Sequence, residues 1–290
     1  MLTCPLSGNH GNHQLFYSAT RVIAETLGYN WGFNPHPEFD YHHGEPQMSF
    51  MDIDYGIEHD AKYLELPNGI TNIWHEKYVD IPNSDGASFH FYDPTIWNLP
   101  DNTKLVLRCC QDARYFEHKK EDMKRWFKIK LEKIEEYESI ISEREIVFDD
   151  NLCCINIRGG EYKNIPSLIL SQSYWLNAID KMKQKGIKKF IVITDDVSYV
   201  NQLLPDIPAY HFSIGCDYYI LTQAHNLILS NSSFAILPVW LSEKHPYVIA
   251  PRYWARHNIS DGYWASSDIW TFGKDGNWQF LDRDGELYER

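Results

Sequence analysis

The stretch Asn151-Leu-Cys-Cys-Ile-Asn-Ile157 begins a regular alternation of short apolar runs and amphipathic segments. The apolar runs are residues 152–157, 190–193, 226–229 and 247–250. The amphipathic segments are residues 173–185, 197–204, 216–225 and 232–242. Apolar strands separated by helices are typical of a parallel sheet that is covered on both faces. We therefore expect an α/β domain that starts near residue 151.

The first half of the chain opens with a strand, a glycine turn and a helix. We expect a strand within residues 1–7, a turn at Gly8–Asn12, an amphipathic helix at 14–27, a strand near 104–109 and a charged helix from about Glu117 to Arg144. Strand, glycine turn and helix are the start of a nucleotide-binding α/β unit. Residues 30–100 show no regular pattern, so the sequence predicts two domains with a boundary near residue 150.

Composition argues against several classes of protein. The net charge is −13 and no stretch rich in Lys and Arg stands out, which argues against a nucleic-acid partner. No run of about 20 apolar residues predicts a membrane span, and no signal peptide is expected. The six cysteines include two adjacent pairs and no C-x-x-C zinc pattern. Neighbours on a strand face opposite ways, so we expect free thiols in a reducing, cytoplasmic compartment.

Polar residues follow the predicted strands of the second half. Arg158 comes after the first strand, Asp195 and Asp196 after the next, and Ser232 and Ser233 after a third. The carboxyl ends of parallel strands meet at one edge, where ligands bind. Arginine presents a fork of donors that matches phosphate oxygens, and the start of a helix also favours an anion. The set therefore predicts a nucleoside diphosphate site, although each residue has a structural alternative as a helix cap or an ion-pair partner.

Six blocks along the chain carry a resemblance to a known family. They are Gly8-Asn-His-Gly-Asn12-His-Gln-Leu-Phe-Tyr17, Leu107-Arg-Cys-Cys-Gln-Asp-Ala-Arg-Tyr-Phe116, Asn156-Ile-Arg-Gly-Gly-Glu-Tyr162, Thr194-Asp-Asp196, Ser230-Asn-Ser-Ser-Phe234 and Val248-Ile-Ala-Pro-Arg-Tyr-Trp254. In this order they resemble the α-1,2-fucosyltransferase family (glycosyltransferase family 11-like), within the wider fucosyltransferase superfamily.

The resemblance implies a GT-B-like fold, in which two Rossmann-like domains face each other across a cleft. Residues 1–150 would form the acceptor-side domain, 151–265 the nucleotide-sugar-binding domain and 266–290 a C-terminal tail. The implied activity is an inverting transfer of fucose from GDP-fucose to a glycan hydroxyl, with no cofactor and no essential metal. Such an enzyme must stabilise the departing diphosphate with protein donors.

The resemblance also implies roles for individual residues. Arg158 would neutralise the diphosphate, and Glu161 is a candidate general base that could equally be the partner of Arg158. The predicted donor-binding residues are Gly11, Asn12, Arg158, Asp195, Asp196, Asn231, Ser232, Ser233 and Phe234.

Departures from the family pattern leave alternatives open. Where the family has a second arginine, this chain has Gly159, and Asn156 and Glu161 replace the histidine and aspartate of the same motif. A different nucleotide-sugar, or an inactive homologue that binds a carbohydrate or nucleotide, therefore remains an alternative. A metal-dependent transferase is a further alternative, because Asp52-Ile-Asp54 has the D-x-D pattern that holds Mg²⁺ or Mn²⁺.

Overall fold

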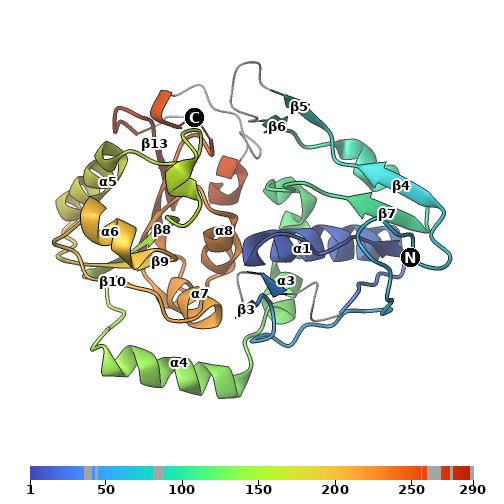
Figure 1. Cartoon of the computed structure of the whole chain (residues 1–290), viewed down its shortest axis with the longest axis horizontal. Helices are drawn as coiled ribbons and strands as arrows, with labels where there is room; N and C mark the ends of the chain where they lie inside the picture. Colours follow the sequence, from blue (N-terminus) through green and yellow to red (C-terminus); the bar gives the residue numbers. More distant parts are fainter. Residues whose placement is uncertain are drawn as a thin grey trace.

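Two parallel sheets lie on opposite sides of a central pair of helices, α1 (His10–Leu27) and α8 (Ser233–Trp240) (Figure 1). This computed structural model describes residues 1–35, 41–42, 45–80, 88–255, 257–259, 269–274 and 277–287. Residues up to α4 (Leu131–Glu143) form the first half of the molecule, and the second half begins with β8 (Leu152–Ile157).

The first half is built on a three-stranded parallel sheet. Its order is β1-β7-β4, from β1 (Leu2–Thr3), β7 (Thr103–Val106) and β4 (Asn72–His75). Two short antiparallel pairs accompany it, β2 (Tyr41–His42) with β3 (Glu45–Pro46) and β5 (Tyr78–Asp80) with β6 (Ser88–His90). Helix α1 follows β1 and is capped by Gly28 with φ 75°, so the predicted strand and helix are confirmed. The predicted turn at Gly8–Asn12 is shorter than expected, because the helix already begins at His10.

The second half contains a six-stranded parallel sheet of order β10-β9-β8-β11-β12-β13. Counted from β8, this order is 3-2-1-4-5-6, the order of the Rossmann fold. The other strands are β9 (Lys189–Thr194), β10 (Ala209–Tyr210), β11 (Asn226–Leu229), β12 (Tyr247–Pro251) and β13 (Trp278–Leu281), with helices α5 (Gln172–Gln184), α6 (Val197–Leu203) and α7 (Ile214–Gln223) between them. The predicted alternation of strands and helices is confirmed.

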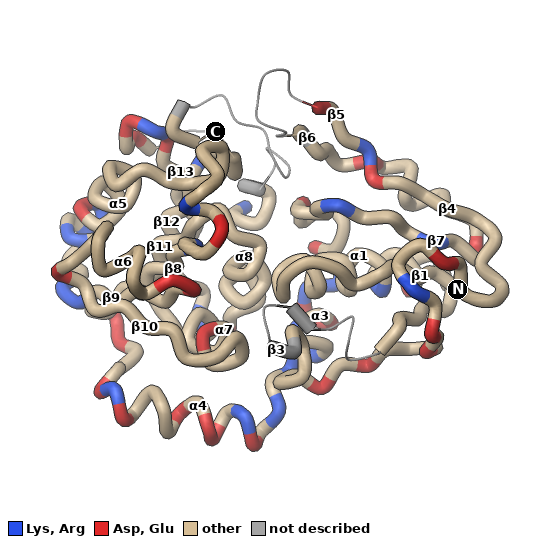
Figure 2. Tube along the Cα trace, viewed as in Figure 1, with Lys and Arg blue, Asp and Glu red and all other residues tan. Residues whose placement is uncertain are grey.

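The prediction of one charged helix from Glu117 to Arg144 was wrong. The segment forms a short 3₁₀ turn, then α3 (Lys120–Trp126) and then α4. The chain breaks between the helices because Phe127 and Ile129 are buried there, and Ile129 bridges to Met51. Charged residues of both signs alternate along α4 (Figure 2), as a solvated helix face requires.

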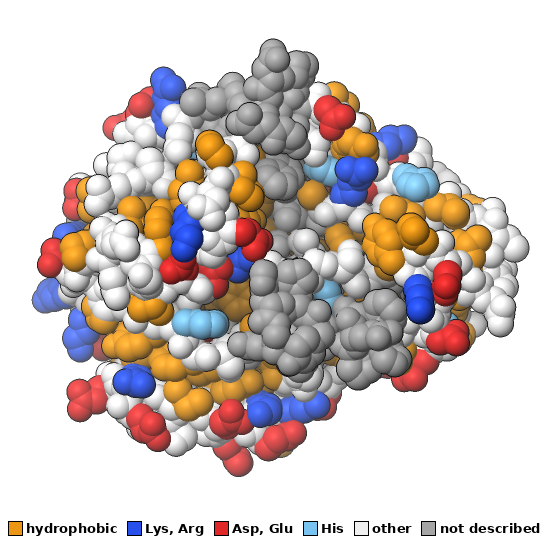
Figure 3. Space-filling model, viewed as in Figure 1, with side chains coloured by type: hydrophobic (Ala, Val, Ile, Leu, Met, Phe, Trp, Pro, Cys, Tyr) orange, Lys and Arg blue, Asp and Glu red, His pale blue; other side chains and the backbone are white. Residues whose placement is uncertain are grey.

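One hydrophobic cluster joins the two halves. It runs from Leu2 and Phe16 of the first half to Leu229 and Phe280 of the second. A second cluster, under α5 and α6, covers the other face of the six-stranded sheet. On the face shown in Figure 3, hydrophobic side chains also gather over the first half. Exposed hydrophobic residues of the first half include Ile57, Tyr63, Leu64, Leu66 and Ile73. Charges of both signs are interspersed on that face.

Part of the segment 266–290 belongs to the second sheet. Strand β13 pairs in parallel with β12, and the 3₁₀ turn Ile269–Gly273 contacts the first half through the bond from Ala113 N–H to Thr271 Oγ1 (2.9 Å). The described part of this segment therefore packs on both halves, while the division of the chain into domains stays a prediction. Within the described residues, every helix is too short or too polar to cross a membrane. All six cysteines are described and buried, and none forms a disulfide with another.

Candidate active site

A cavity of about 700 Å³ lies between the two halves. It sits at the carboxyl ends of β8, β9 and β11, where the sheet order reverses between β8 and β11. This reversal is the point at which α/β sheets bind ligands. Residues of both halves line this cavity. The first half contributes Asn12, Arg108 and Gln111, among others, and the second half contributes residues that include Arg158, Glu161, Asp195, His211, Asp217, Ser232, Ser233 and Phe234.

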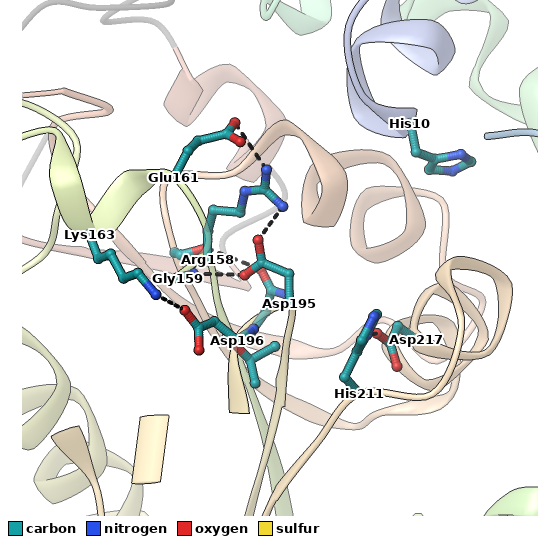
Figure 4. A network of polar contacts seen from close by, with 12 residues as sticks. His10, Arg158, Gly159, Glu161, Lys163, Asp195, Asp196, His211 and Asp217 are labelled. Carbon is teal, nitrogen blue, oxygen red and sulfur yellow. Dashed lines mark hydrogen bonds and ion pairs between the residues drawn. The ribbon is translucent and has the colours of Figure 1, made fainter. Parts of the chain in front are cut away.

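Arg158 lies directly after β8, between two carboxylates (Figure 4). One of its terminal nitrogens is 3.1 Å from Glu161 Oε1, and the other forms an ion pair with Asp195. Asp195 also accepts the backbone N–H of Gly159 at 2.7 Å. Burial raises the pKa of Tyr162, whose ring centre is 5.5 Å from the Arg158 guanidinium, to about 12, so this phenol stays protonated. These contacts hold the guanidinium at the edge of the cavity.

Asp196 has a structural role next to this site. Its carboxylate accepts the backbone N–H of Tyr199 at 2.9 Å and so caps α6. Its other oxygen pairs with Lys163, and this contact lowers the pKa of Asp196. Of the two neighbouring aspartates, Asp195 lines the cavity, while Asp196 is absent from the lining that the described residues form.

Two helices begin at the cavity, α1 after Asn9 and α8 after Ser232. In the part of the chain that the structure describes, neither cap residue bonds its own helix through its side chain. The first-turn amides of a helix need partners and carry a partial positive charge. Because Asn12 and Ser233 also line the cavity, both helix starts face the same space, and together they favour an anion there.

Two of the predicted donor-binding residues support the lining rather than form it. The buried amide of Asn231 donates to Leu168 O (2.8 Å) and to Trp254 O (2.6 Å), which fixes the loops of two lining residues. Gly11 lies where α1 meets α8, and a Cβ atom there would be 2.3 Å from the backbone of Ser233. Among the described residues, the structure brings Arg158, Glu161, Asn12, Asp195, Ser232, Ser233 and Phe234 together in one cavity.

Sequence reasoning missed a histidine–aspartate pair in the same cavity. His211 follows β10, and its Nδ1 is 2.7 Å from Asp217 Oδ2 (Figure 4). The other oxygen of Asp217 accepts the backbone N–H of Phe212 at 3.2 Å. The signal was available, because the sequence predicts a short strand near Tyr210, and the carboxyl end of β10 (Ala209–Tyr210) reaches the same edge. The polar residues that follow this strand were not assigned to the site.

The D-x-D pair lies outside the cavity lining that the described residues form. The backbone carbonyl of Asp54 accepts the Tyr17 hydroxyl at 2.8 Å, and its side chain accepts the backbone N–H of Gly56 at 2.9 Å. Within the described ranges, no group of three or more His, Cys, Asp or Glu side chains is arranged to hold a metal ion.

The family follows from the sequence between residues 88 and 269, which matches the model of glycosyl transferase family 11. This match covers more than half of the chain. The chain belongs to glycosyl transferase family 11. The resemblance seen in the motif blocks is thereby confirmed, and this family 11 chain is a glycosyltransferase. No curated protein sequence shows significant similarity to it.

Solved structures show the fold of this family 11 enzyme. The apo form of POFUT1 matches with a TM-score of 0.50 and 10% identity, over 86% of this chain and 96% of POFUT1. The α-1,6-fucosyltransferase NodZ, co-crystallised with GDP, matches with a TM-score of 0.48 and 12% identity, over 99% of this chain and 97% of NodZ. Fucosyltransferase NodZ from Bradyrhizobium matches with a TM-score of 0.44 and 13% identity, over 83% and 93%. The likeness to POFUT1, together with the two parallel sheets, confirms the predicted GT-B-like α/β fold.

Proposed function

We propose that this enzyme transfers fucose from GDP-fucose to a glycan hydroxyl, with inversion and without an essential metal. The observation that carries the proposal is Arg158, which lines one cavity with the starts of α1 and α8. Fucose as the sugar is supported by the motif blocks of the α-1,2-fucosyltransferases and by family membership. POFUT1, whose fold the chain shares, has been crystallised with GDP-fucose.

The proposed transfer is a single displacement. The acceptor oxygen forms a bond to the anomeric carbon while the bond from that carbon to the β-phosphate oxygen breaks. The electron pair leaves with GDP, and charge builds up on the diphosphate. Arg158 and the two helix starts stabilise this charge, the role that a metal ion has in other transferases. Preorganised donors of this kind support a metal-independent mechanism.

Glu161 is the proposed acceptor of the hydroxyl proton. In the free protein it is half exposed and pairs with Arg158 at 3.1 Å. A diphosphate that binds Arg158 competes with this ion pair, since a guanidinium has a limited number of donors. Glu161 is then a carboxylate at the edge of the cavity, within reach of the group that reacts. Proton transfer to such a positioned carboxylate is general base catalysis.

Asp217 is proposed to recognise the guanine base. Guanine presents an N–H and an amino group side by side, and a carboxylate can accept both. Among the described carboxylates of the lining, Asp195 and Glu161 are paired with Arg158, whereas Asp217 lies after β10, further along the sheet edge. His211 holds the Asp217 side chain in place. Asp195, between Arg158 and Asp217 along the edge, is placed to contact the ribose.

The cytoplasm is the proposed location, because six buried cysteines that form no disulfide with one another suit a reducing compartment. Gly159, which stands where the family has a second arginine, favours one alternative function. A homologue that lacks this cation could bind the nucleotide-sugar without cleaving it. Release of GDP from GDP-fucose separates the two, since cleavage needs the transition-state stabilisation that a binding protein lacks.

The experiment compares the wild-type protein with Arg158→Ala, using chromatography to follow the release of GDP from GDP-fucose. We expect release by the wild-type protein and a rate about 100- to 1000-fold lower for Arg158→Ala, because one donor to the developing charge is lost. Circular dichroism should show the same fold for both. Arg125→Ala is the matched control, since Arg125 lies on α3 and its side chain is 71% exposed.

Two results would contradict this proposal. Near-normal release by Arg158→Ala would remove the proposed site. No release by a folded wild-type protein that still binds GDP-fucose would favour the inactive homologue instead.

A further inference from the structure

Arg108 lines the cavity from the half opposite to Arg158. It follows β7, and its guanidinium carbon lies 4.0 Å above the centre of the Tyr78 ring. Its side chain is exposed, and no carboxylate in the described part of the chain pairs with it. A guanidinium that stacks on an aromatic ring keeps its edge free to bind a planar or tetrahedral anion.

The backbone that carries Arg108 is fixed by a buried carboxylate. Glu76 follows β4 and is 4% exposed. Its Oε2 accepts the backbone N–H of Arg108 at 2.6 Å and that of Cys109 at 2.9 Å, and its Oε1 accepts that of Cys110 at 2.9 Å. Cys110 has a φ of 50°, so the loop takes a backbone conformation that only strong local bonds maintain. Glu76 therefore holds Arg108 in one place at the cavity wall.

The charged residues that line the cavity show why a cation at residue 108 is important. Among the described lining residues, Arg108 and Arg158 are the Lys or Arg side chains, against the carboxylates of Glu161, Asp195 and Asp217. Arg158 already pairs with Glu161 and Asp195. A diphosphate brings further negative charge into a site with more carboxylates than cations. Arg108 is the lining cation whose charge is not already matched by a described carboxylate.

The place of the second family arginine is closed in this chain. A Cβ atom on Gly159 would lie 2.8 Å from Asp196 Cβ and 3.0 Å from the Tyr199 ring. Asp196 is held there by the α6 cap and by Lys163. A longer side chain at residue 159 would displace these groups, so a second cation has to come from another part of the chain.

We propose that Arg108 supplies this second positive charge, so that the donor diphosphate is bound by arginines from both halves of the molecule. Glu76 is then a positioning residue, which acts through Arg108. This inference rests on the proposed function, because it assumes that a nucleoside diphosphate occupies the cavity. The proposal adds an arginine of the first half to the donor site, whereas the family motif has both of its arginines in the second half.

The experiment measures the affinities of GDP and GMP by calorimetry for the wild-type protein, Arg108→Gln and the control Arg125→Gln. GMP has the same base and α-phosphate but lacks the β-phosphate. A charge-assisted hydrogen bond lost from the β-phosphate should weaken GDP binding by about 10- to 100-fold, and GMP binding by much less. Arg125→Gln removes the same charge from an exposed helix and should change neither affinity.

The inference is overturned if Arg108→Gln binds GDP as tightly as the wild-type protein, or if GDP and GMP lose the same factor. The first result would also follow if Arg108 bound an anionic acceptor instead of the donor. Failure of the proposed function is seen separately, because it is judged by whether the wild-type protein binds GDP at all.

The role of Glu76 is tested by Glu76→Gln alone and together with Arg108→Gln. We expect Glu76→Gln to lower the ratio of GDP to GMP affinity in the wild-type background and to leave it unchanged once Arg108 is gone, because the two residues act as a unit. If Glu76→Gln still lowers the ratio of GDP to GMP affinity in the Arg108→Gln background, the positioning role of Glu76 is overturned. Arg108→Gln decides the central inference by itself.

Discussion

Arg158, Asp195 and Asp217 line the cavity at one edge of the six-stranded sheet, and we propose that each contacts a different part of the donor. In this proposal Arg158 binds the diphosphate, Asp195 the ribose and Asp217 the base. In the free protein Arg158 is held by two carboxylates, so binding exchanges ion pairs rather than creating a charge in an empty site. The free energy gained is therefore smaller than that of an isolated arginine–phosphate contact, because one ion pair is lost when the other forms.

Asp217→Asn is expected to reduce selectivity for guanine. The carboxylate accepts two adjacent N–H donors of the base, whereas the amide can accept with one oxygen only. GDP affinity should fall about 10-fold or more, and the preference for GDP over IDP, which lacks the amino group, should shrink. Competition calorimetry with both nucleotides measures this, with the exposed Asp206→Asn as the control. An unchanged preference would refute base recognition by Asp217.

At the scale of single residues, the strand-end rule explains what the sequence could predict. Arg158, Asp195 and Ser232 follow strands long enough to be recognised, and all three line the cavity. Asn231 was also predicted there, but its amide is used by two backbone carbonyls, which a linear pattern does not show. Arg108 lies within a motif block, but the sequence pattern assigns it no role, because its position depends on Glu76, more than 30 residues away in the chain.

Among the elements, α1 and α8 determine how closely the two halves approach. Their contact depends on Gly11, since any side chain there meets the backbone of Ser233 and Phe234. The glycine therefore lets two helix starts share one cavity. The role of Gly11 is helix packing beside the cavity, and not the turn that the sequence predicts, because Gly11 lies within α1.

Gly11→Ala should push the start of α1 away from α8. We expect a loss of about 1–3 kcal/mol in the free energy of unfolding, from overpacking, and weaker GDP binding. Gly28→Ala is the matched control, because φ at Gly28 is 75° but no atom lies within 4 Å of the added Cβ. It should cost about 1 kcal/mol and leave GDP affinity unchanged. Urea denaturation and calorimetry measure both effects, and equal GDP affinity in the two variants would contradict the packing role.

His257, in the 3₁₀ turn His257–Ile259, makes the stability of the protein depend on pH. Burial lowers the pKa of His257 to about 4, and its ring lies 5.2 Å from that of Tyr174. Since the unfolded chain binds this proton with an ordinary pKa near 6.5, stability is full above that pH and falls as the pH drops towards about 4. The expected slope from this group is about 1.4 kcal/mol per pH unit.

Urea denaturation at several pH values between about 4.5 and 7 measures this slope. His257→Gln should have a shallower slope over that range than the wild-type protein. Burial also lowers the pKa values of His59, His90 and His118, so part of the dependence will remain in the variant. Identical slopes for the two proteins would show that His257 does not contribute.

Helices and strands could be predicted from the sequence where their pattern depends on neighbouring residues alone. The strands and helices of the second half follow the alternation of apolar runs, and their bounds differ from the prediction by a few residues. The break between α3 and α4 was missed because it comes from the contact of Ile129 with Met51, which is distant in the sequence. Strand β4 lies in the stretch of residues 30–100 that showed no pattern, since its residues alternate between half-buried and exposed on a small sheet edge.

For the whole molecule, two parallel sheets and a cavity between them were expected, and the GT-B-like fold was found. The sheets differ in size, with three strands in the first half and six in the second. Two short antiparallel pairs accompany the smaller sheet of the first half (Figure 1). Strand β13 was not predicted, because it is a short strand at the outer edge of the sheet, where it pairs with β12.

We propose that a guanine nucleoside diphosphate binds between the two halves against Arg158. The most direct test is a thermal denaturation of the wild-type protein with GDP, UDP or CDP, repeated with Arg158→Ala. A ligand at 100 times its dissociation constant stabilises the native state by about 2.7 kcal/mol. We predict that GDP raises the melting temperature of the wild-type protein by several degrees while UDP and CDP do not, and that Arg158→Ala loses this shift. Equal shifts with all three nucleotides, or an undiminished GDP shift in Arg158→Ala, would contradict the account.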